Sequence, residues 1–386
     1  MYKYIIALVI VIVFSLPFLN LSSNYNEKEI RLGMSGPFSG NLHTLGEELM
    51  LGINAYFRHI NEQGGINGRV FRVITRDDRY EPKITAENTE GLIKKQKVFA
   101  LIGFIGTPTS KVALPIAMKY RVPFIGAFSG AKFLRANPRN PLVLNGRTSY
   151  RKEIEALIKY FVDEGKYKKI AVFYQNDSYG RSGLIDIKEI LRHRDAKLVA
   201  EGSYKRNTLS VGNALYEISQ NKPEVVILIG STKPTAEFIK RAREDKNLKN
   251  VKFGAISFIG SSMLLKALHG DVKNIIFSQV VPSPWGALSQ EVGLYRDLMD
   301  KYYSGREYSY VSLEGYFIAK LTAELFKRVG KDFTKEDFID EIRYLYSEIE
   351  KSRNLDESKR VCKCLNNVYL TYYDDGIFWD IDEKDK

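Results

Sequence analysis

The feature that most constrains the fold of this chain is a short apolar run followed by glycines and a hydroxyl residue next to proline. Residues 98–102 form the run, which has the length and flanks typical of a buried strand in a parallel sheet. Thr107 and Pro108 then indicate a helix start, because the hydroxyl can accept from free N–H groups and proline tolerates the first turn. A second strand, 123–125, leads to Ser129. Both hydroxyls are thus expected at one sheet edge, where open α/β sheets bind ligands; the alternative is that they are only a cap and a turn.

The same pattern occurs again in the later part of the chain. Residues 225–229 are apolar and are followed by Gly230, Ser231, Thr232, a proline and a helical run from residue 236. Two such edges that face each other would form a cleft with polar groups on both walls. Ser231 and Thr232 are therefore candidate ligand-binding residues.

Strand and helix patterns alternate along the chain, which predicts parallel sheets covered by helices on both faces. Strands are expected at residues 30–33, 70–75, 98–102, 123–125, 170–174, 198–203, 225–229 and 253–256. Helices are expected at residues 45–62, 85–95, 107–120, 150–164, 181–192, 236 onward, 292–303, 312–329 and 335–347. A charged loop at 351–360 precedes a hairpin of residues 368–373 and 376–381, since aspartate–glycine is a hairpin turn signal.

The first 29 residues predict export. Lys3 precedes an apolar run at 4–21, and polar residues 22–29 lead into the first strand. A positive start, an apolar middle and a polar exit are typical of a signal peptide. Because the run is close to the ~20 residues that span a bilayer, an uncleaved anchor is the alternative, and a buried core helix is a third interpretation.

The composition argues against several function classes. The 386 residues carry a formal charge of +12, but the basic residues are scattered among acids, so nucleic-acid binding is not expected. Only four histidines occur, and none has a metal-spaced or nucleophile partner. The chain has no P-loop, G-x-S-x-G or H-E-x-x-H motif. We therefore expect no enzyme activity, no metal and no cofactor.

Two residue pairs leave alternatives open. Asp77 and Asp78 at a strand end could bind a cation, although a solvated turn is the more usual role of such a pair. Cys362 and Cys364 are either two free thiols on a strand or, in an oxidising compartment, a small strained disulfide.

Short motifs in order along the chain point to a known family. They are IRLGMSGPFSG at 30–40, INEQGGING at 60–68, the Asp77-Asp78 pair, LIG at 101–103, VPFI at 122–125 and DSYG at 177–180. Over about residues 30–347 the chain resembles the branched-chain amino-acid (Leu/Ile/Val-binding) type of periplasmic binding protein. The resemblance implies an α/β fold of two Rossmann-like lobes with parallel sheets, joined by a three-crossover hinge. It also implies capture of a small polar solute and delivery to an ABC-transporter permease.

The resemblance further implies where a ligand binds. In that family hydroxyls and backbone N–H groups hold the ligand's carboxylate, and those positions match Thr107, Phe128 and Gly130, with Ser129 between them. A tyrosine of the second lobe matches Tyr179.

Two departures from the family pattern predict a ligand without a strongly held ammonium. The acid that meets an amino group belongs near Ser257, but residues 253–262 contain no Asp or Glu, and Gly130 replaces the usual hydroxyl. A buried ammonium without a carboxylate partner is costly to desolvate. We expect a ligand with a carboxylate or similar acceptor, held near a helix N-terminus, and Asp177 is the one acid that could substitute.

The predicted organisation is a segment of residues 1–29 and two interleaved lobes. One lobe comprises 30–146 with 281–360, and the other 147–280 with 361–386. The predicted function is extracytoplasmic solute capture by hinge closure. The alternative is a membrane-anchored ligand-sensing ectodomain, which would touch the membrane only through its N-terminal segment. A cytoplasmic Rossmann-type enzyme would need a G-x-G-x-x-G turn, which is absent.

Overall fold

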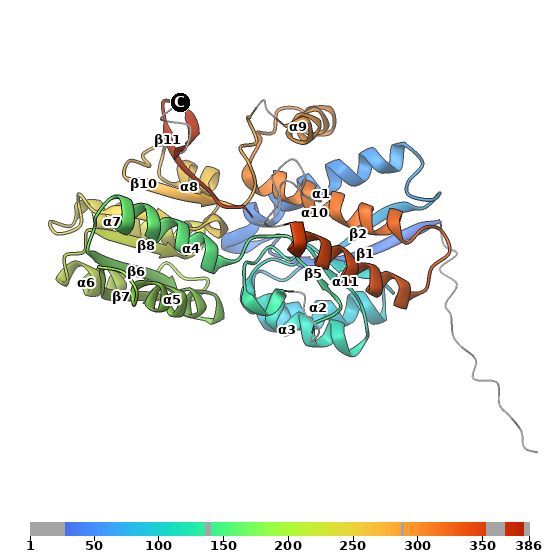
Figure 1. The fold of residues 1–386 in the computed structure, drawn as a ribbon, viewed down its shortest axis with the longest axis horizontal. Coiled ribbons are helices and arrows are strands. Elements are labelled where there is room, and N and C mark those ends of the chain that lie inside the picture. Colours follow the sequence, from blue (N-terminus) through green and yellow to red (C-terminus); the bar gives the residue numbers. More distant parts are fainter. Residues whose placement is uncertain (1–27, 136–139, 287–288, 353–366, 382–386) are drawn as a thin grey trace, which may run out of the picture.

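The chain folds around two separate β-sheets. The computed structural model describes residues 28–135, 140–286, 289–352 and 367–381. Within them, one sheet has the strand order β2-β1-β3-β4-β5 and the other β12-β11-β10-β9-β8-β6-β7. Each sheet carries helices on both faces, and we call a sheet with its helices a lobe. The two lobes lie side by side along the long axis of the molecule (Figure 1), which confirms the predicted fold class.

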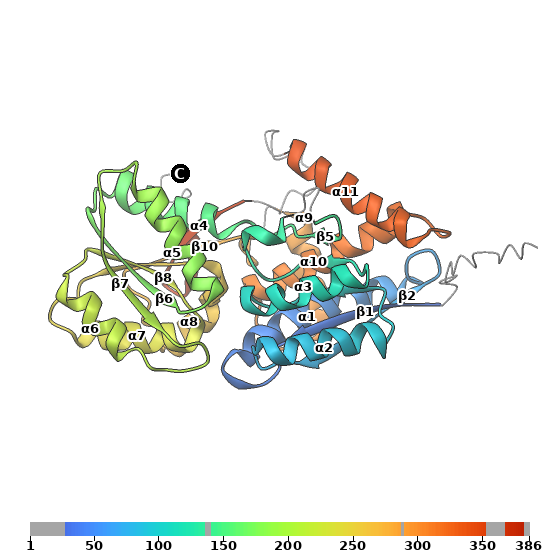
Figure 2. The same cartoon turned by 90° about the horizontal axis from the view of Figure 1, so that it is seen from below.

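The first lobe is a parallel sheet between helices. Its strands are β1 (Glu29–Gly36), β2 (Val70–Asp77), β3 (Ala100–Ile102), β4 (Phe124–Ile125) and β5 (Val143–Leu144). One face is covered by α1 (His43–Glu62) and α10 (Tyr310–Arg328), the other by α2 (Pro82–Lys94) and α3 (Thr107–Lys119) (Figures 1 and 2). Helix α9 (Gln290–Tyr302) packs against α1 and α10, and α11 (Lys335–Ser352) packs against α10 and the strand β5. The 3-10 turns are η1 (Gly40–Leu42) and η2 (Lys132–Leu134).

The second lobe adds an antiparallel hairpin to a parallel sheet. The parallel strands are β6 (Lys169–Gln175), β7 (Lys197–Tyr204), β8 (Val225–Ile229), β9 (Lys252–Ala255) and β10 (Ile275–Gln279). The hairpin is β11 (Tyr369–Asp374) and β12 (Ile377–Asp380). One face carries α4 (Tyr150–Ile158), its π-helical continuation η3 (Lys159–Glu164) and α5 (Ser178–Leu191) (Figure 2). The other face carries α6 (Gly212–Gln220), α7 (Thr232–Glu244), the 3-10 turn η4 (Ser257–Ile259) and α8 (Ser261–Ala267).

The chain passes between the lobes more than once. It leaves the first sheet after β5, and it returns after β10 to form α9, α10 and α11 against the first lobe. It then enters the second sheet again as β11, by way of residues 353–366, which lie outside the described ranges. The two sheets therefore draw on interleaved parts of the chain, whereas the exact lobe boundaries stay a prediction.

Most of the predicted strands and helices are confirmed, and the final hairpin pairs as expected. The sequence does not predict β5, β10, α6 or α8. β5 has two residues and α8 seven, too few for periodicity to reveal them. β10 is as long as β8, but its last two residues, Ser278 and Gln279, are polar, so its apolar run is shorter. Helix α7 begins at Thr232, earlier than expected, because Pro234 fits within its first turn.

Helices α1 and α10 approach each other so closely that only glycine fits at two positions. Gly52 of α1 is buried, and a Cβ there would lie 1.7 Å from the Ser312 carbonyl oxygen. A Cβ at Gly315 of α10 would lie 2.1 Å from the Leu49 carbonyl oxygen. The two glycines therefore set the separation of the helices that cover one face of the first sheet.

Several predictions fall outside the described residues. These are the export segment up to residue 27, most of the loop at 351–360, and Cys362 and Cys364. Of the helices in the described ranges, none is both long and apolar enough to cross a membrane.

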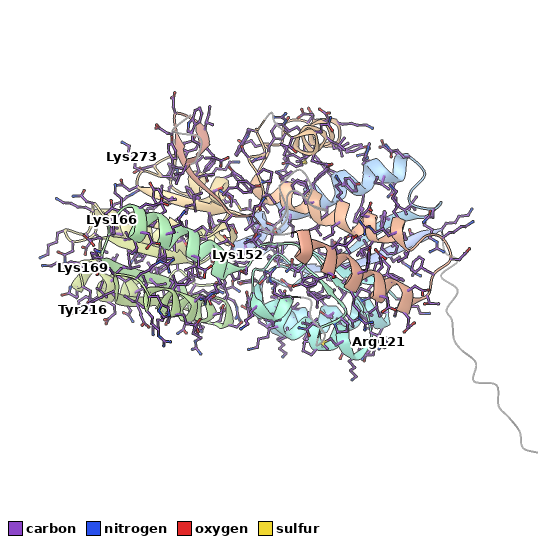
Figure 3. The ribbon with its side chains drawn as sticks, in the orientation of Figure 1. Arg121, Lys152, Lys166, Lys169, Tyr216 and Lys273 are labelled. Atoms are coloured by element: carbon purple, nitrogen blue, oxygen red, sulfur yellow. The ribbon has the colours of Figure 1, made fainter. Side chains whose placement is uncertain are left out.

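Basic side chains lie on the outer surface of the second lobe. Lys166, Lys169 and Lys273 are exposed and project away from the ribbon (Figure 3). The positive charge of the chain is thus carried in part by solvated lysines far from the junction of the lobes.

Candidate functional site

The carboxyl ends of β3 and β4 bring two hydroxyl groups together. The Thr107 and Ser129 side-chain oxygens lie 2.9 Å apart, and both residues are buried. Gly106, with a φ of 96°, is the residue before helix α3, so Thr107 is already helical. The expectation that the Thr107 hydroxyl caps this helix is therefore wrong: the left-handed glycine starts the helix one residue earlier, and the hydroxyl meets Ser129 instead.

Tyr150 packs against the loop that carries these hydroxyls. Its backbone N–H donates to the Gly130 carbonyl at 3.1 Å, and a Cβ at Gly130 would lie 2.5 Å from the Tyr150 nitrogen. This contact is the physical reason for glycine at position 130. The buried Tyr150 hydroxyl lies beside the Ser129 hydroxyl and the Gly130 backbone, whose hydrogen bonding opposes the effect of burial on its pKa. Burial raises the pKa of Tyr150, so the hydroxyl stays protonated and can donate.

The corresponding edge of the second lobe is at the carboxyl end of β8. The Ser231 N–H donates to the Tyr204 hydroxyl oxygen at 2.8 Å, and the two side-chain oxygens are 3.1 Å apart. The Thr232 hydroxyl donates to the Ile259 carbonyl at 2.5 Å. Both predicted residues thus bond within their own lobe.

Buried aromatic rings fill the space between the two edges. We call Tyr80, Phe128, Tyr150, Tyr179 and Phe258 the aromatic cluster. The Phe258 ring centroid lies 4.8 Å from that of Tyr179, 5.7 Å from Phe128 and 6.1 Å from Tyr80. Since Tyr80 and Phe128 belong to the first lobe, Phe258 reaches across from the second. The Tyr179 hydroxyl donates to the Gly230 carbonyl at 3.2 Å, which ties the cluster to the β8 edge.

A buried charged network lies behind Phe128 and connects the lobes. The Arg147 guanidinium lies 4.2 Å from the Phe128 ring centroid and hydrogen-bonds to Glu314 of α10 and to the Ser257 hydroxyl. One Glu153 oxygen lies 3.9 Å from the guanidinium. Burial raises the pKa of Glu314, although Arg147 opposes the shift. The three charged side chains are therefore shielded from solvent and depend on one another.

The network corrects one expectation from the sequence. No acid lies within residues 253–262, yet a Glu153 oxygen accepts from the Ser257 N–H at 2.8 Å and from the Ser278 hydroxyl at 2.7 Å. Glu153 comes from α4, 104 residues earlier in the chain. A carboxylate is thus present at Ser257 in space, but Arg147 lies there as well.

Asp77 and Asp78 hold the loops that carry Tyr80. The Asp78 carboxylate is buried and accepts from the Ser35 hydroxyl at 2.9 Å, the Thr85 hydroxyl at 3.0 Å and the Tyr80 N–H at 2.9 Å. Asp77 accepts from three backbone N–H groups of the adjacent loops. The solvated turn expected here is wrong for Asp78, because its carboxylate organises the interior of the loop.

The two aspartates predict a pH dependence of stability. Burial raises the pKa of Asp78 from its usual 3.8 to about 6. The folded protein then binds this proton more tightly than the unfolded chain, so the contribution to stability is full below about pH 4 and is lost as pH rises through about 6. Two pKa units correspond to about 3 kcal/mol. The unfolding free energy of the wild type, measured by urea titration, should therefore fall between pH 4 and pH 7. Asp78→Asn should reduce this fall by about that amount.

Asp77→Asn is the matched control for this measurement. Burial acts against ionisation of Asp77 too, but hydrogen bonds from Ser39 and from backbone N–H groups outweigh it and lower the pKa of Asp77. Its contribution is therefore present at neutral pH and lost in acid, which is the opposite sign. If the unfolding free energy of Asp78→Asn falls between pH 4 and 7 as much as that of the wild type, another buried acid causes the fall.

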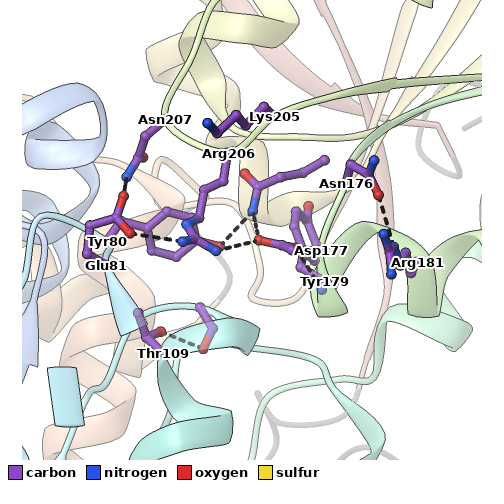
Figure 4. A network of polar contacts seen from close by, with 12 residues as sticks. Tyr80, Glu81, Thr109, Asn176, Asp177, Tyr179, Arg181, Lys205, Arg206 and Asn207 are labelled. Carbon is purple, nitrogen blue, oxygen red and sulfur yellow. Dashed lines mark hydrogen bonds and ion pairs between the residues drawn. The ribbon is translucent and has the colours of Figure 1, made fainter. Parts of the chain in front are cut away.

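Polar contacts close the rim between the lobes. Arg206 of the second lobe lies between Glu81 of the first lobe, at 2.9 Å, and Asp177, at 3.3 Å (Figure 4). The Asn207 amide donates to Glu81 at 2.6 Å. Asp177 also accepts from the Tyr179 N–H at 3.0 Å, so it caps helix α5 and positions the tyrosine. Both carboxylate oxygens of Asp177 are engaged in these contacts, so the carboxylate is not available to pair with an ammonium group.

The described residues contain no group of three or more His, Cys, Asp or Glu side chains placed to hold a metal ion. At the junction the described residues place hydroxyl groups, aromatic rings and one buried ionic network.

The family of this chain follows from a comparison with known protein families. Residues 29–349 match the family described as periplasmic binding protein. The chain belongs to the periplasmic binding protein family.

Relatives and solved structures agree with this assignment. A Leu/Ile/Val-binding protein homolog 7 of Brucella abortus (strain 2308) is 25% identical over 229 residues, which are 56% of each protein. This periplasmic binding protein thus matches just over half the length of that curated relative. A structure titled as a possible leucine/isoleucine/valine-binding protein from Rhodopirellula baltica is 29% identical, with a TM-score of 0.82 over 92% of this chain and 96% of that chain. A branched chain amino acid ABC transporter from Thermus thermophilus with bound valine, at 19% identity, a TM-score of 0.77 and coverage of 92% and 95%, shows the shared fold.

The structure of this periplasmic binding protein brings most of the predicted site residues together. Thr107 meets Ser129, and Ser129 and Gly130 lie against the buried Tyr150, with Phe128 between them in the same loop. Tyr179 and Ser257 meet them through the aromatic cluster and the Arg147 network, whereas Ser231 and Thr232 bond within the second lobe. Their roles in ligand binding stay a prediction.

Five residues of the candidate site are not predicted from the sequence: Tyr80, Arg147, Tyr150, Glu153 and Phe258. Tyr80 and Phe258 are near neighbours of Asp78 and Ser257, so proximity to a motif is a signal that could find them. Tyr150 follows Ser149, a helix N-cap, and gives a weaker signal. Arg147 and Glu153 give none, because their partners are distant in the sequence.

Proposed function

We propose that this protein is an exported, non-enzymatic solute-binding protein that captures a small solute between its lobes and delivers it to an ABC permease. The observation that carries the proposal is the convergence of strand ends from both lobes on one buried cluster, with rim contacts between the lobes. Ligand sites of α/β proteins lie at such edges and between domains.

Export and partners follow from different observations. The N-terminal 29 residues have the order of a signal peptide, which supports a periplasmic or extracellular location. Relatives and structures named as Leu/Ile/Val-binding or branched-chain amino-acid transporter proteins support delivery to a permease. The lobes are proposed to comprise residues 30–146 with 281–360, and 147–280 with 361–386.

The carboxylate or similar acceptor of the solute is proposed to bind at the start of α3. Thr107 and Ser129 offer hydroxyls, and the N-terminus of this 13-residue helix offers N–H groups and a favourable dipole. The protonated Tyr150 hydroxyl adds a buried donor beside Ser129. An anionic acceptor placed among these donors completes their hydrogen bonds.

Thr107→Val tests this assignment. Removing one hydrogen bond to a charged group should weaken binding by roughly 1.5–3 kcal/mol, measured by calorimetry with a solute identified in a thermal-shift screen. The screen covers amino acids, amides, ureas and small carboxylates, because a ligand at 100 times its dissociation constant adds about 2.7 kcal/mol of stability.

Thr322→Val is the control for loss of a buried hydroxyl. Thr322 is also buried, but its hydroxyl donates to the Ile318 carbonyl within α10. It should change stability and leave affinity intact. Equal affinity of the wild type and Thr107→Val would remove the carboxylate assignment, and a screen without any stabilising solute would count against solute binding itself.

A further inference from the structure

We propose that the second lobe docks through its outer end on a membrane surface rich in anionic lipid headgroups. This surface is separate from the candidate site and adds an interaction to solute capture. Three features of the second lobe carry the inference: its excess of positive charge, the gathering of basic side chains at one edge of its sheet, and the engagement of the nearby acids with other groups.

The positive charge of the chain is concentrated in the second lobe. Residues 147–280 contain 24 lysines and arginines but only 15 aspartates and glutamates. Most of the formal charge of +12 therefore belongs to this segment. An excess of one sign on part of a surface creates a local potential that attracts partners of the opposite charge.

The loops of the second lobe bring basic side chains to one edge of the sheet. Strands β6 to β10 are parallel, so their amino ends lie at the same edge, opposite the carboxyl ends near the candidate site. We call the exposed basic side chains of this edge the basic pole: Lys166, Lys169, Arg192, Lys197, Lys222, Lys246, Lys249 and Lys273. Three of them are labelled at the outer end of the lobe in Figure 3.

The acids of the same loops are engaged with other groups. Asp195 pairs with Lys168, and Asp271 pairs with Arg243 at 2.9 Å. Glu224 accepts from two backbone N–H groups at the start of β6, at 2.7 and 2.9 Å. Within the described ranges, no carboxylate lies within ion-pair distance of a side chain of the basic pole. The charges of the pole are therefore available to an external anion.

The residue types of the pole fit lipid headgroups. All but one of its cations are lysines, which are flexible point charges, whereas arginine is favoured where a phosphate is held in a fixed bidentate geometry. Clusters of lysines bind anionic lipids through many such weak attractions. Tyr216 of α6 is 63% exposed and lies at the same end of the lobe (Figure 3). Tyrosine is enriched where proteins meet the headgroup layer.

Docking at this end leaves the candidate site uncovered. Ser231 follows the carboxyl end of β8, whereas Lys222 precedes its amino end, so the whole strand separates them. The N-terminal segment predicts export, so the protein is expected to work beside a membrane. A contact through the basic pole would hold the protein there and leave solute capture unaffected.

Sedimentation of the full-length protein with vesicles tests the docking. Vesicles of equal parts phosphatidylglycerol and phosphatidylcholine should bind it at least about 100-fold more tightly than phosphatidylcholine vesicles, because each lysine near an anionic surface strengthens binding several-fold. Binding to the neutral vesicles measures the contribution of the apolar residues 4–21. The preference should largely disappear at about 0.5 M salt, where charges are screened within about 5 Å. Equal binding to both kinds of vesicle would overturn the proposal.

Two variants that lose the same charge locate the contact. The pole variant combines Lys166→Gln, Lys169→Gln, Lys222→Gln and Lys249→Gln. The control variant changes four exposed lysines of the first lobe: Lys83→Gln, Lys95→Gln, Lys97→Gln and Lys111→Gln. The preference for anionic vesicles should fall at least about 30-fold in the pole variant and less than about fivefold in the control. Equal losses would assign the effect to net charge and overturn the role of the pole.

Two further measurements keep the assignment testable. Anionic vesicles should slow the acetylation of Lys169 and Lys222, read by mass spectrometry, and leave that of Lys83 and Lys111 unchanged; pole lysines that stay reactive would overturn the contact. Tighter binding of duplex DNA than of anionic vesicles at equal phosphate concentration would assign the pole to nucleic acid instead of lipid. Solute binding should be the same in both variants, so a failure of this proposal leaves the proposed function standing.

Discussion

Replacing Arg147 with methionine is expected to lower the free energy of unfolding by about 3–5 kcal/mol, the usual cost of removing one partner from a buried ion pair. The guanidinium is 1% exposed and lies between Glu153 and Glu314, whose side chains are 0% and 6% exposed. Without it, two buried carboxyl groups of different lobes must ionise unpaired or take up protons. Urea denaturation at pH 7 measures the loss, and the loss should shrink at pH 5, because burial raises the pKa of Glu314 and its carboxyl group then protonates more easily.

Two further variants show whether the cost of Arg147→Met comes from leaving buried carboxylates without a partner. Arg147→Met combined with Glu153→Gln and Glu314→Gln removes all three charges and should recover most of the loss. Arg121→Met breaks the Arg121–Glu336 pair, whose side chains are 62% and 64% exposed, and should cost at most about 1 kcal/mol. If Arg147→Met cost no more than Arg121→Met, the buried network would not hold the lobes.

Local patterns in the sequence predict the elements well where the signal is contained in a short segment. β8 forms over residues 225–229 as predicted, because an apolar run between polar flanks is a local property. Tyr369–Asp374 and Ile377–Asp380 pair as a hairpin for the same reason. The start of α3 is predicted to within one residue, and the error comes from the left-handed Gly106.

The same kind of pattern cannot predict which distant side chains meet. The Glu153 carboxylate reaches Ser257 across 104 residues, and Arg147 reaches Glu314 across 167. A scan of residues 253–262 therefore finds no acid, although one is present in space. Phe258 is likewise visible as an apolar residue, but its position among rings of both lobes depends on how the lobes meet. The meeting of Thr107 and Ser129 could be predicted because both residues follow adjacent strands; the other contacts of the candidate site needed the packed structure.

Gly52→Ala is expected to destabilise the protein by about 3 kcal/mol, at the upper end of typical overpacking costs. A Cβ at this position would lie 1.7 Å from the Ser312 carbonyl oxygen and 2.7 Å from the Tyr316 nitrogen, both of them backbone atoms of α10. Backbone cannot swing away as a side chain can, so α10 must move off α1 and lose packing along the whole contact. Thermal or urea unfolding measures the effect, and Gly315→Ala should show it too because its Cβ would lie 2.1 Å from the Leu49 carbonyl oxygen.

Gly91→Ala shows whether this cost comes from the close approach of the helices. Gly91 lies within α2, but a Cβ there would meet no atom within 4 Å. Alanine is the better helix former by about 1 kcal/mol, so this variant should be as stable as the wild type or more stable. The two substitutions change the same chemical group in two helices of the first lobe, and only the surroundings differ. Opposite signs of the stability change would show that the α1–α10 contact requires glycine, whereas a loss in both would point to the backbone of the glycines themselves.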